Sequence, residues 1–297
     1  MLRSFLRKRF GRHGYLQEWR ATLEQRPLDA GLHLQFAKRC LSQGNIRVAY
    51  AELRTAQALG LASAEIAPYE KDVVRKLAPR ESLGYNQYSR LRTLSSVIRK
   101  LAAGSQVSIL DVGGGHGLLA QFIPEVTYCL AEPSVNGISG MDLPFADGSF
   151  DYVVACHVLE HVPRDGRERF LDQLAAKAKR AVILLNPFDI KGIYAEELTE
   201  LIIEITSADW AKEHRACSLP RIEDVKEYAR MRGLSCDVGP EGTLTTSLAM
   251  VFVEFFARKA GLLNQCAKVI RFFNLHYSES MESEMSFGTC LVVLAKP

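Results

Sequence analysis

The stretch that decides the fold is ILDVGGGHG, residues 109–117, where alternate glycines directly follow a short apolar run. The apolar run ending at Asp111 predicts a buried strand, and the glycines predict a tight turn before a helix over GLLAQFIP, residues 117–124. Glycine is favoured where a ligand lies against the backbone, because it has no Cβ. In a strand–turn–helix unit this turn lies at the cofactor crevice, beyond the carboxyl end of the strand.

The spacing of the glycines restricts what the turn can bind. Counted from Gly113, the dinucleotide fingerprint GxGxxG fails, because its third glycine falls on Leu118. Counted from Gly115, it places Ala120 in the third position, which a known variant permits. Nicotinamide binding therefore stays open on spacing alone. A P-loop is excluded, because no GK[ST] follows the turn.

Outward from the turn, apolar runs alternate with helical patterns towards the C-terminus. VTYCLAE, DYVVACHV and AVILLN read as strands, LSCDV and GTCLVVLAK as late strands, and a helical insertion is predicted near 244–275. Near-continuous apolar strands between helices are typical of parallel sheets that are buried on both faces. The pattern predicts a doubly wound, Rossmann-like α/β domain over residues 81–297, with a mostly parallel sheet and helices on both faces.

The first 80 residues read as a separate helical region. Residues 28–66 predict two helices joined by Gly-Asn, with small residues spaced as in one tetratricopeptide repeat. An ordinary helical hairpin is the alternative, because repeat arrays need about three copies. We expect the hairpin to contact a protein partner. The basic residues 1–12 predict either a frayed terminus or weak contact with an anionic membrane surface or an acidic partner.

Composition excludes several classes of protein. The 297 residues are 47% hydrophobic and carry a formal net charge of +3, which does not favour a nucleic-acid partner. No apolar run reaches the roughly 18 residues that a membrane span needs, and the N-terminus lacks the pattern of a signal peptide. Seven cysteines without CxxC spacing indicate reduced thiols. We therefore expect a soluble, cytoplasmic protein.

Two further motifs narrow the kind of cofactor that the glycine turn is expected to bind. Glu132 ends the strand after the glycine turn, and a carboxylate at that position can accept both hydroxyls of a ribose. DLPFADGSFDYVVACHVLEHV follows at residues 142–162. Together with ILDVGGGHG these motifs resemble the class I S-adenosylmethionine-dependent methyltransferases, in particular the type 11 group. The resemblance covers residues 107–188 well and implies a Rossmann-like fold, S-adenosylmethionine as cofactor and methyl transfer.

The resemblance implies roles for individual residues. Cofactor contacts fall on Asp111, Gly113, Gly115, Gly117, Glu132, Asp142, Leu143 and Cys156. His157 would lie with Cys156 under the sulfonium centre, and we count it as a catalytic candidate. This sequence departs from the family between Glu132 and Asp142, because PSVNGISG is too short for the helix and strand that members commonly carry there.

Other candidate residues come from the segments expected to cover the crevice. Tyr88 in NQYSRLRTL would contact the cofactor, unless this segment is simply an amphipathic helix. His214 beside Glu213 is a candidate general base, and a surface histidine is the alternative reading. His157, Glu160 and His161 also spell HxxEH, a zinc motif of certain peptidases. We expect no metal site there, because that motif needs both histidines on one helix.

The leading hypothesis is therefore a methyltransferase that acts on a small-molecule or sugar-like acceptor. Two alternatives stay open: a nicotinamide-dependent oxidoreductase with the same fold, and an inactive methyltransferase-fold adaptor that binds proteins through its hairpin. Apolar residues of the helical insertion, around Phe252 and Phe256, predict either core packing or a homodimer face.

Overall fold

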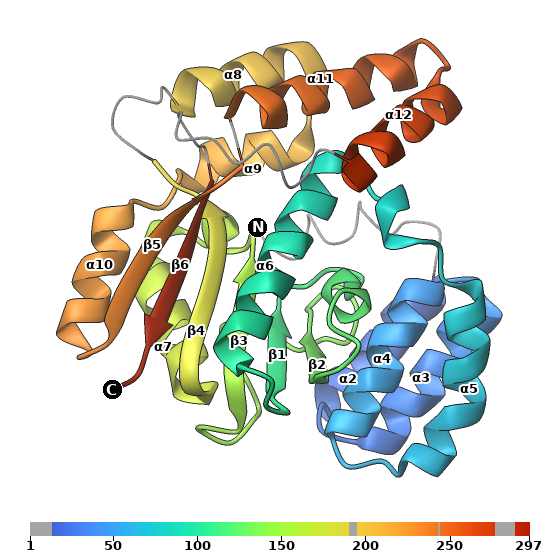
Figure 1. Cartoon of the computed structure of the whole chain (residues 1–297). Helices are drawn as coiled ribbons and strands as arrows, with labels where there is room; N and C mark the ends of the chain where they lie inside the picture. Colours follow the sequence, from blue (N-terminus) through green and yellow to red (C-terminus); the bar gives the residue numbers. More distant parts are fainter. Residues whose placement is uncertain (1–13, 190–194, 243, 277–288) are drawn as a thin grey trace. The chain divides into compact units, whose positions relative to one another are not determined.

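A computed structural model describes residues 14–189, 195–242, 244–276 and 289–297 (Figure 1). The N-terminal helices are α2 (Gly14–Gln25), α3 (Ala30–Ser42), α4 (Ile46–Ala58) and α5 (Ser63–Lys76), and α6 (Tyr85–Ala102) precedes the first strand. The later helices are α7 (Arg167–Lys177), α8 (Ala195–Thr206), α9 (Asp209–Cys217), α10 (Ile222–Met231), α11 (Leu244–Lys259) and α12 (Leu263–His276). The short 3₁₀ turns are η1 (Arg80–Ser82), η2 (Leu118–Gln121), η3 (Leu159–His161) and η4 (Arg164–Gly166).

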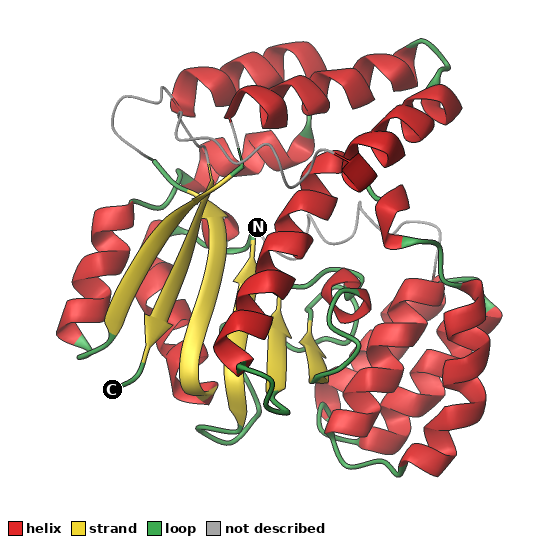
Figure 2. Cartoon of the chain, viewed as in Figure 1, coloured by secondary structure: helices red, strands yellow, loops and turns green. Residues whose placement is uncertain are grey.

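The described strands form a six-stranded sheet in the order β2-β1-β3-β4-β6-β5 (Figure 2). They are β1 (Ser108–Val112), β2 (Thr127–Ala131), β3 (Phe150–Cys156), β4 (Ala178–Pro187), β5 (Ser235–Glu241) and β6 (Thr289–Ala295). β1 pairs in parallel with β2 and β3, whereas β6 pairs antiparallel with β4 and β5. The predicted α/β class with a mostly parallel, Rossmann-like sheet is confirmed.

The predicted helix over residues 117–124 is wrong in extent. Only the 3₁₀ turn η2 forms there, over four residues. The carbonyls of Ala120, Ile123 and Val126 accept hydrogen bonds from the guanidinium of Arg54 on α4. Ala120 O and Val126 O therefore bond to a side chain in place of the backbone N–H groups that a continuing helix would supply, and Ile123 O also accepts from Val126 N.

The chain separates into two compact units. The first comprises residues 1–77, 106–154 and 173–179, and the second comprises residues 78–105, 155–172 and 180–297. The N-terminal helices thus cluster with β1, β2 and most of β3. The domain boundary at residue 80 stays a prediction, although many contacts of the first unit cross it.

The N-terminal region contains the expected helical hairpin. Asp29 caps α3 by accepting a hydrogen bond from Leu32 N at 2.9 Å, and Gly44, with φ 78°, lies in the turn before α4. The likeness to a tetratricopeptide repeat stays a prediction. The basic segment 1–12 lies outside the described residues. No described helix has the length and apolar character that a membrane span requires. All seven cysteines are described, and each is a free thiol.

Helix α4 covers the edge strand β2 within the first unit. Thr55 Oγ1 accepts a hydrogen bond from Leu130 N at 2.9 Å, and Asn136 Nδ2 donates to Leu130 O at 2.9 Å. An edge strand otherwise presents unpaired backbone groups to solvent or to other chains. Two side chains therefore satisfy Leu130, one from α4 and one from the loop after β2.

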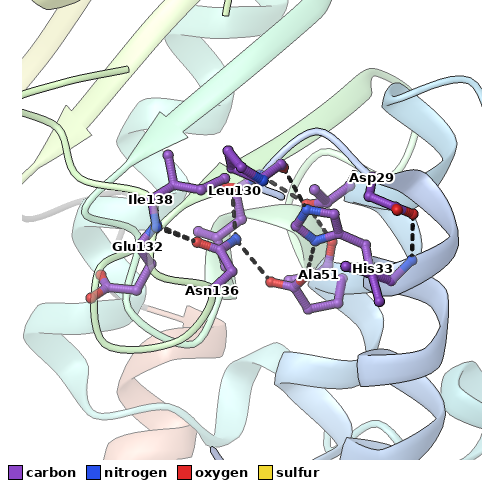
Figure 3. Close-up of polar contacts among 11 residues, drawn as sticks. Asp29, His33, Ala51, Leu130, Glu132, Asn136 and Ile138 are labelled. Carbon is purple, nitrogen blue, oxygen red and sulfur yellow. Dashed lines mark hydrogen bonds and ion pairs between the residues drawn. The ribbon is translucent and has the colours of Figure 1, made fainter. Parts of the chain in front are cut away.

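A chain of buried polar side chains continues from this edge into the hairpin (Figure 3). Asn136 Nδ2 also donates to Glu52 Oε1 at 3.0 Å, and Glu52 Oε2 lies 2.5 Å from His33 Nδ1. The other ring nitrogen of His33 lies 2.9 Å from Pro27 O. Burial alone would lower the pKa of His33, but the Glu52 carboxylate holds this pKa above its ordinary value. The pair is thus an ion pair in the interior.

Replacement of Arg54 tests the link between α4 and η2. The Arg54 side chain is buried, and Arg54→Met would remove a donor from three backbone carbonyls, of which only Ile123 O would keep a hydrogen bond, from Val126 N. Each lost hydrogen bond from a charged group costs about 1.5–3 kcal/mol. We therefore expect the unfolding free energy to fall by several kcal/mol. Urea denaturation followed by circular dichroism measures this. The exposed Arg75→Met on α5 is the control and should change the midpoint little. Equal midpoints for both variants would contradict the assignment.

The His33–Glu52 pair predicts a pH dependence of stability. The folded pKa of His33 is raised, so the pair contributes fully below about pH 6.5, and the contribution is lost as pH rises through the folded pKa. Between pH 6 and pH 9, the melting temperature of the wild type should therefore fall further than that of His33→Gln. His276→Gln, at an exposed position on α12, should follow the wild type. Parallel curves for the wild type and His33→Gln would show that the pair does not titrate as proposed.

Candidate functional site

The glycine turn follows β1 as predicted, and its backbone is left-handed at three positions. The φ angles of Gly113, Gly115 and Gly117 are 73°, 58° and 68°. Gly113 N donates to Ala131 O at 2.8 Å, which extends the β1–β2 pairing into the turn. Since Val112 lies opposite Ala131 in a parallel register, the turn and the loop after β2 leave the same edge of the sheet. Such an edge is where open α/β sheets bind ligands.

Glu132 lies directly against this turn. Its Oε2 accepts a hydrogen bond from Gly115 N at 2.9 Å, and its Oε1 accepts from Ser134 N at 2.9 Å and Ser134 Oγ at 2.5 Å. Asn136 Oδ1 accepts from Glu132 N at 3.0 Å (Figure 3). A carboxylate offers about four lone-pair positions, so Glu132 keeps acceptor capacity for a ligand hydroxyl. The structure therefore brings the predicted ribose-binding acid and the glycine turn together.

The side chain of Asp111 packs against the glycine turn at Gly114. Its side chain is buried, and Tyr128 Oη donates to Asp111 Oδ2 at 2.7 Å. Burial raises the pKa of Asp111 to about 7, although the Tyr128 hydrogen bond opposes this. A Cβ on Gly114 would lie 2.2 Å from Asp111 Oδ2, so no larger residue fits there. Sequence reasoning missed Gly114, and its only signal was the uninterrupted GGG run.

Gly115 and Gly117 are glycines for different reasons. A Cβ on Gly115 would meet no atom within 4 Å, so beside this residue the backbone is open to a ligand. A Cβ on Gly117 would lie 2.2 Å from the Cβ of Ala51 on α4. The close packing of α4 against the turn therefore explains why residue 117 is a glycine, and no contact with a ligand is needed to explain it. Its predicted cofactor contact stays a prediction.

The loop after Glu132 is irregular throughout, as its length predicted. Residues 132–149 are all described and contain neither helix nor strand. Asp142 is exposed, and its N–H donates to Ser139 O at 3.1 Å. Leu143 is buried, and its N–H donates to Gln173 Oε1 at 3.0 Å. The expected backbone contact of Leu143 with an adenine ring would have to replace that bond, and the roles of both residues stay predictions.

The remaining candidates belong to the second unit. Tyr88 is buried on α6, and burial raises its pKa. Cys156 ends β3 and is partly buried. His157 follows with φ 55°, an unusual backbone conformation for a residue with a Cβ, while its N–H donates to Leu185 O at 2.8 Å. His157 therefore lies at a strand end, as the sequence indicated.

His157 and His214 converge on one buried carboxylate. Glu160 Oε1 lies 3.0 Å from His157 Nδ1 and 3.8 Å from His214 Nε2. His161 joins them from η3, with its ring centroid 4.8 Å from that of His214 on α9. Burial lowers the pKa of His214 to about 4, so its imidazole is neutral at physiological pH. A base of such low pKa accepts protons weakly, and the proposed role of His214 as general base stays a prediction.

Sequence reasoning did not predict that Glu160 and His161 lie beside His214. Burial raises the pKa of Glu160, whose side chain is fully inaccessible. The HxxEH pattern was a signal for Glu160 and His161. Nothing in the sequence indicated that α9 would supply a further histidine beside them.

Known proteins with similar sequences are methyltransferases. Residues 83–237, just over half of the chain, match a family described as a methyltransferase domain. An uncharacterized methyltransferase of Mycobacterium marinum is 37% identical over 94 residues, which cover 24% of this chain and 37% of that protein. This chain therefore spans about a third of the length of its curated relative.

Solved structures with similar folds share little sequence with the chain. A phosphoethanolamine N-methyltransferase of Haemonchus contortus, solved with phosphomonomethylethanolamine and S-adenosylhomocysteine, is 14% identical with a TM-score of 0.44. That match covers 69% of this chain and 52% of the other. The magnesium protoporphyrin IX methyltransferase of Synechocystis PCC 6803 is 14% identical with a TM-score of 0.42, over 70% and 84% of the two chains. On the match of residues 83–237, the chain belongs to the methyltransferase domain family.

Proposed function

We propose that the protein is an S-adenosylmethionine-dependent methyltransferase acting on a small-molecule or sugar-like acceptor. The observation that carries the proposal is the contact between Glu132 Oε2 and Gly115 N, 2.9 Å long, at the shared end of β1 and β2. The carboxylate that we propose binds the ribose thus lies beside a glycine that leaves room for a ligand. Membership of the methyltransferase domain family favours S-adenosylmethionine over a nicotinamide cofactor at this edge.

The residues around the turn fit the amino-acid and ribose parts of such a cofactor. Gly115 leaves open space where any other residue would place a Cβ. Glu132 retains acceptor capacity for a ribose hydroxyl, and Ser134 and Asn136 hold its carboxylate and backbone in place. Asp111 is buried and its carboxylate lies against Gly114, where it leaves no room for a side chain.

The bound cofactor would supply a methyl group on a positively charged sulfur, which is already an activated electrophile. The contribution of the chain is then mainly to position donor and acceptor in line and to exclude water. Such positioning can supply roughly 7–11 kcal/mol of the barrier reduction. A base is needed only when the acceptor must lose a proton.

The acceptor class rests on composition and resemblance. A net charge of +3 gives no support to a nucleic-acid substrate, and proteins with this motif pattern serve varied small molecules, including sugars. Isothermal titration with S-adenosylmethionine and with NAD tests the cofactor. A labelled-methyl screen of sugar nucleotides, other small molecules and proteins then tests the acceptor. Binding of NAD without S-adenosylmethionine would refute the proposal.

Replacement of Glu132 tests the ribose contact. Glu132→Ala removes a charged acceptor, which costs about 1.5–3 kcal/mol, so the affinity for S-adenosylmethionine should fall by tens to about a hundredfold. Titration calorimetry measures this, with circular dichroism to confirm that the variant is folded. The exposed Glu125→Ala should bind like the wild type. Unchanged affinity in folded Glu132→Ala would show that the acid does not hold the ribose.

Alanine substitutions at Gly115 and Gly117 distinguish a role in ligand binding from a role in packing within the same turn. Both have positive φ, so alanine costs about 1–2 kcal/mol of strain at either site. Gly117→Ala adds a clash with Ala51 and should lower the melting temperature more. Gly115→Ala should retain more stability but lose affinity for S-adenosylmethionine. The opposite order of melting temperatures, or full affinity in Gly115→Ala, would contradict these roles.

A further inference from the structure

Three metal-binding side chains meet in the second unit, away from the glycine turn in sequence. Glu160, His161 and His214 each present a ligand atom, and these atoms all lie within 4.8 Å of one another. Glu160 and His161 come from the 3₁₀ turn after β3, and His214 comes from α9. The sequence distance between them means that the tertiary fold, and not one helical motif, creates the cluster.

Glu160 is the unusual member of the cluster. Its side chain is fully buried, and its Oε2 accepts a hydrogen bond from Asn186 Nδ2. Its Oε1 has no hydrogen-bond partner, although His157 Nδ1 lies 3.0 Å away and His214 Nε2 lies 3.8 Å away. A buried carboxylate oxygen without a hydrogen bond is costly, and native proteins normally satisfy it with a donor, a water or an ion.

The surroundings favour a cation. Glu213 Oε2 lies 3.0 Å from His161 Nδ1, an outer carboxylate of the kind that orients metal-binding imidazoles. His214 lines a cavity of about 610 Å³ together with Glu197, Glu200 and Glu204 of α8. Arg215 also lines this cavity and pairs with Glu200 at 3.0 Å, which leaves the carboxylates of Glu197 and Glu204 in excess near His214. The positive charge of Arg90 acts against a cation here, because it lies close enough to lower the pKa of both His157 and His214.

We infer that Glu160, His161 and His214 bind a first-row divalent metal ion, for which zinc is the best-suited probe. Two imidazoles and one carboxylate are the protein ligands of one class of zinc sites, whose fourth position holds water or substrate. Zinc bonds of about 2.0–2.2 Å place donors roughly 3–3.5 Å apart. The three side chains would therefore close in by about an ångström on binding. The ion would also supply the missing partner of Glu160 Oε1.

This site differs from the HxxEH motif that the sequence suggested. In that motif both histidines bind the metal from one helix. Here His157 lies at the end of β3 with φ 55°, and the second imidazole comes from α9. The inference uses none of the residues of the glycine turn, so it does not rest on the proposed function.

Zinc titration of untagged, EDTA-treated full-length protein tests the inference. Calorimetry should give one ion per chain, and the affinity should fall more than tenfold in His161→Ala, His214→Ala and Glu160→Gln. Glu160→Gln keeps the shape of the side chain but removes its charge. His276→Ala, which removes an imidazole on α12, should bind like the wild type. Cobalt substitution should give a visible spectrum without the intense near-ultraviolet bands of thiolate ligands, since no cysteine belongs to the set.

Two results would overturn the inference. One is failure of folded wild-type protein to bind zinc. The other is full zinc affinity in the His161→Ala/Glu160→Gln double variant, which would place the ion elsewhere. If His214→Ala does not fold, His161→Ala still decides the matter, because its side chain is 32% exposed and its removal disturbs less packing. A parallel titration with S-adenosylmethionine reports separately on the proposed function.

Discussion

The buried chain from His33 through Glu52 to Asn136 is the interaction on which the first unit depends. It begins in the N-terminal hairpin and ends on the backbone of β2 and of Glu132. An edge strand needs partners for its outward N–H and C=O groups, and here side chains from α4 and from the loop supply them. The hairpin therefore completes the sheet edge as well as covering it.

This arrangement explains why the hairpin matters for the candidate cofactor site. Asn136 connects Glu52 to the N–H of Glu132, and the carboxylate of Glu132 in turn accepts from Gly115 N. On the other side, Ala51 packs against Gly117. Two contacts from one helix, α4, thus reach both the acid and the glycine turn. The hairpin therefore contacts both parts of the candidate cofactor site directly or through one intervening side chain.

The sequence predicted those features that depend on short stretches of chain. The strand ending near Asp111, the glycine turn and the placement of Glu132 follow from local patterns, and the parallel order of β1 and β2 then brings them together. Partners distant in sequence could not be predicted: Asn136 and Glu52 are 84 residues apart. The helix expected at 117–124 failed for the same reason, because Arg54 binds its carbonyls from another helix. The meeting of His161 with His214 likewise depends on tertiary packing.

Two buried histidine–glutamate groups among the described residues differ in how completely their polar atoms are satisfied. In the first unit, Glu52 has a partner on each oxygen and His33 has one on each nitrogen, so the network is closed. In the second unit, Glu160 Oε1 and His157 Nε2 are both buried without a hydrogen-bond partner. A buried network in which every polar atom has a partner makes the fold rigid. A network with unsatisfied polar atoms lowers the stability of the fold unless a ligand or ion satisfies them. The second group also borders a cavity through His214. The pattern of unsatisfied atoms, more than the residue types themselves, therefore supports the inference that the second group binds an ion.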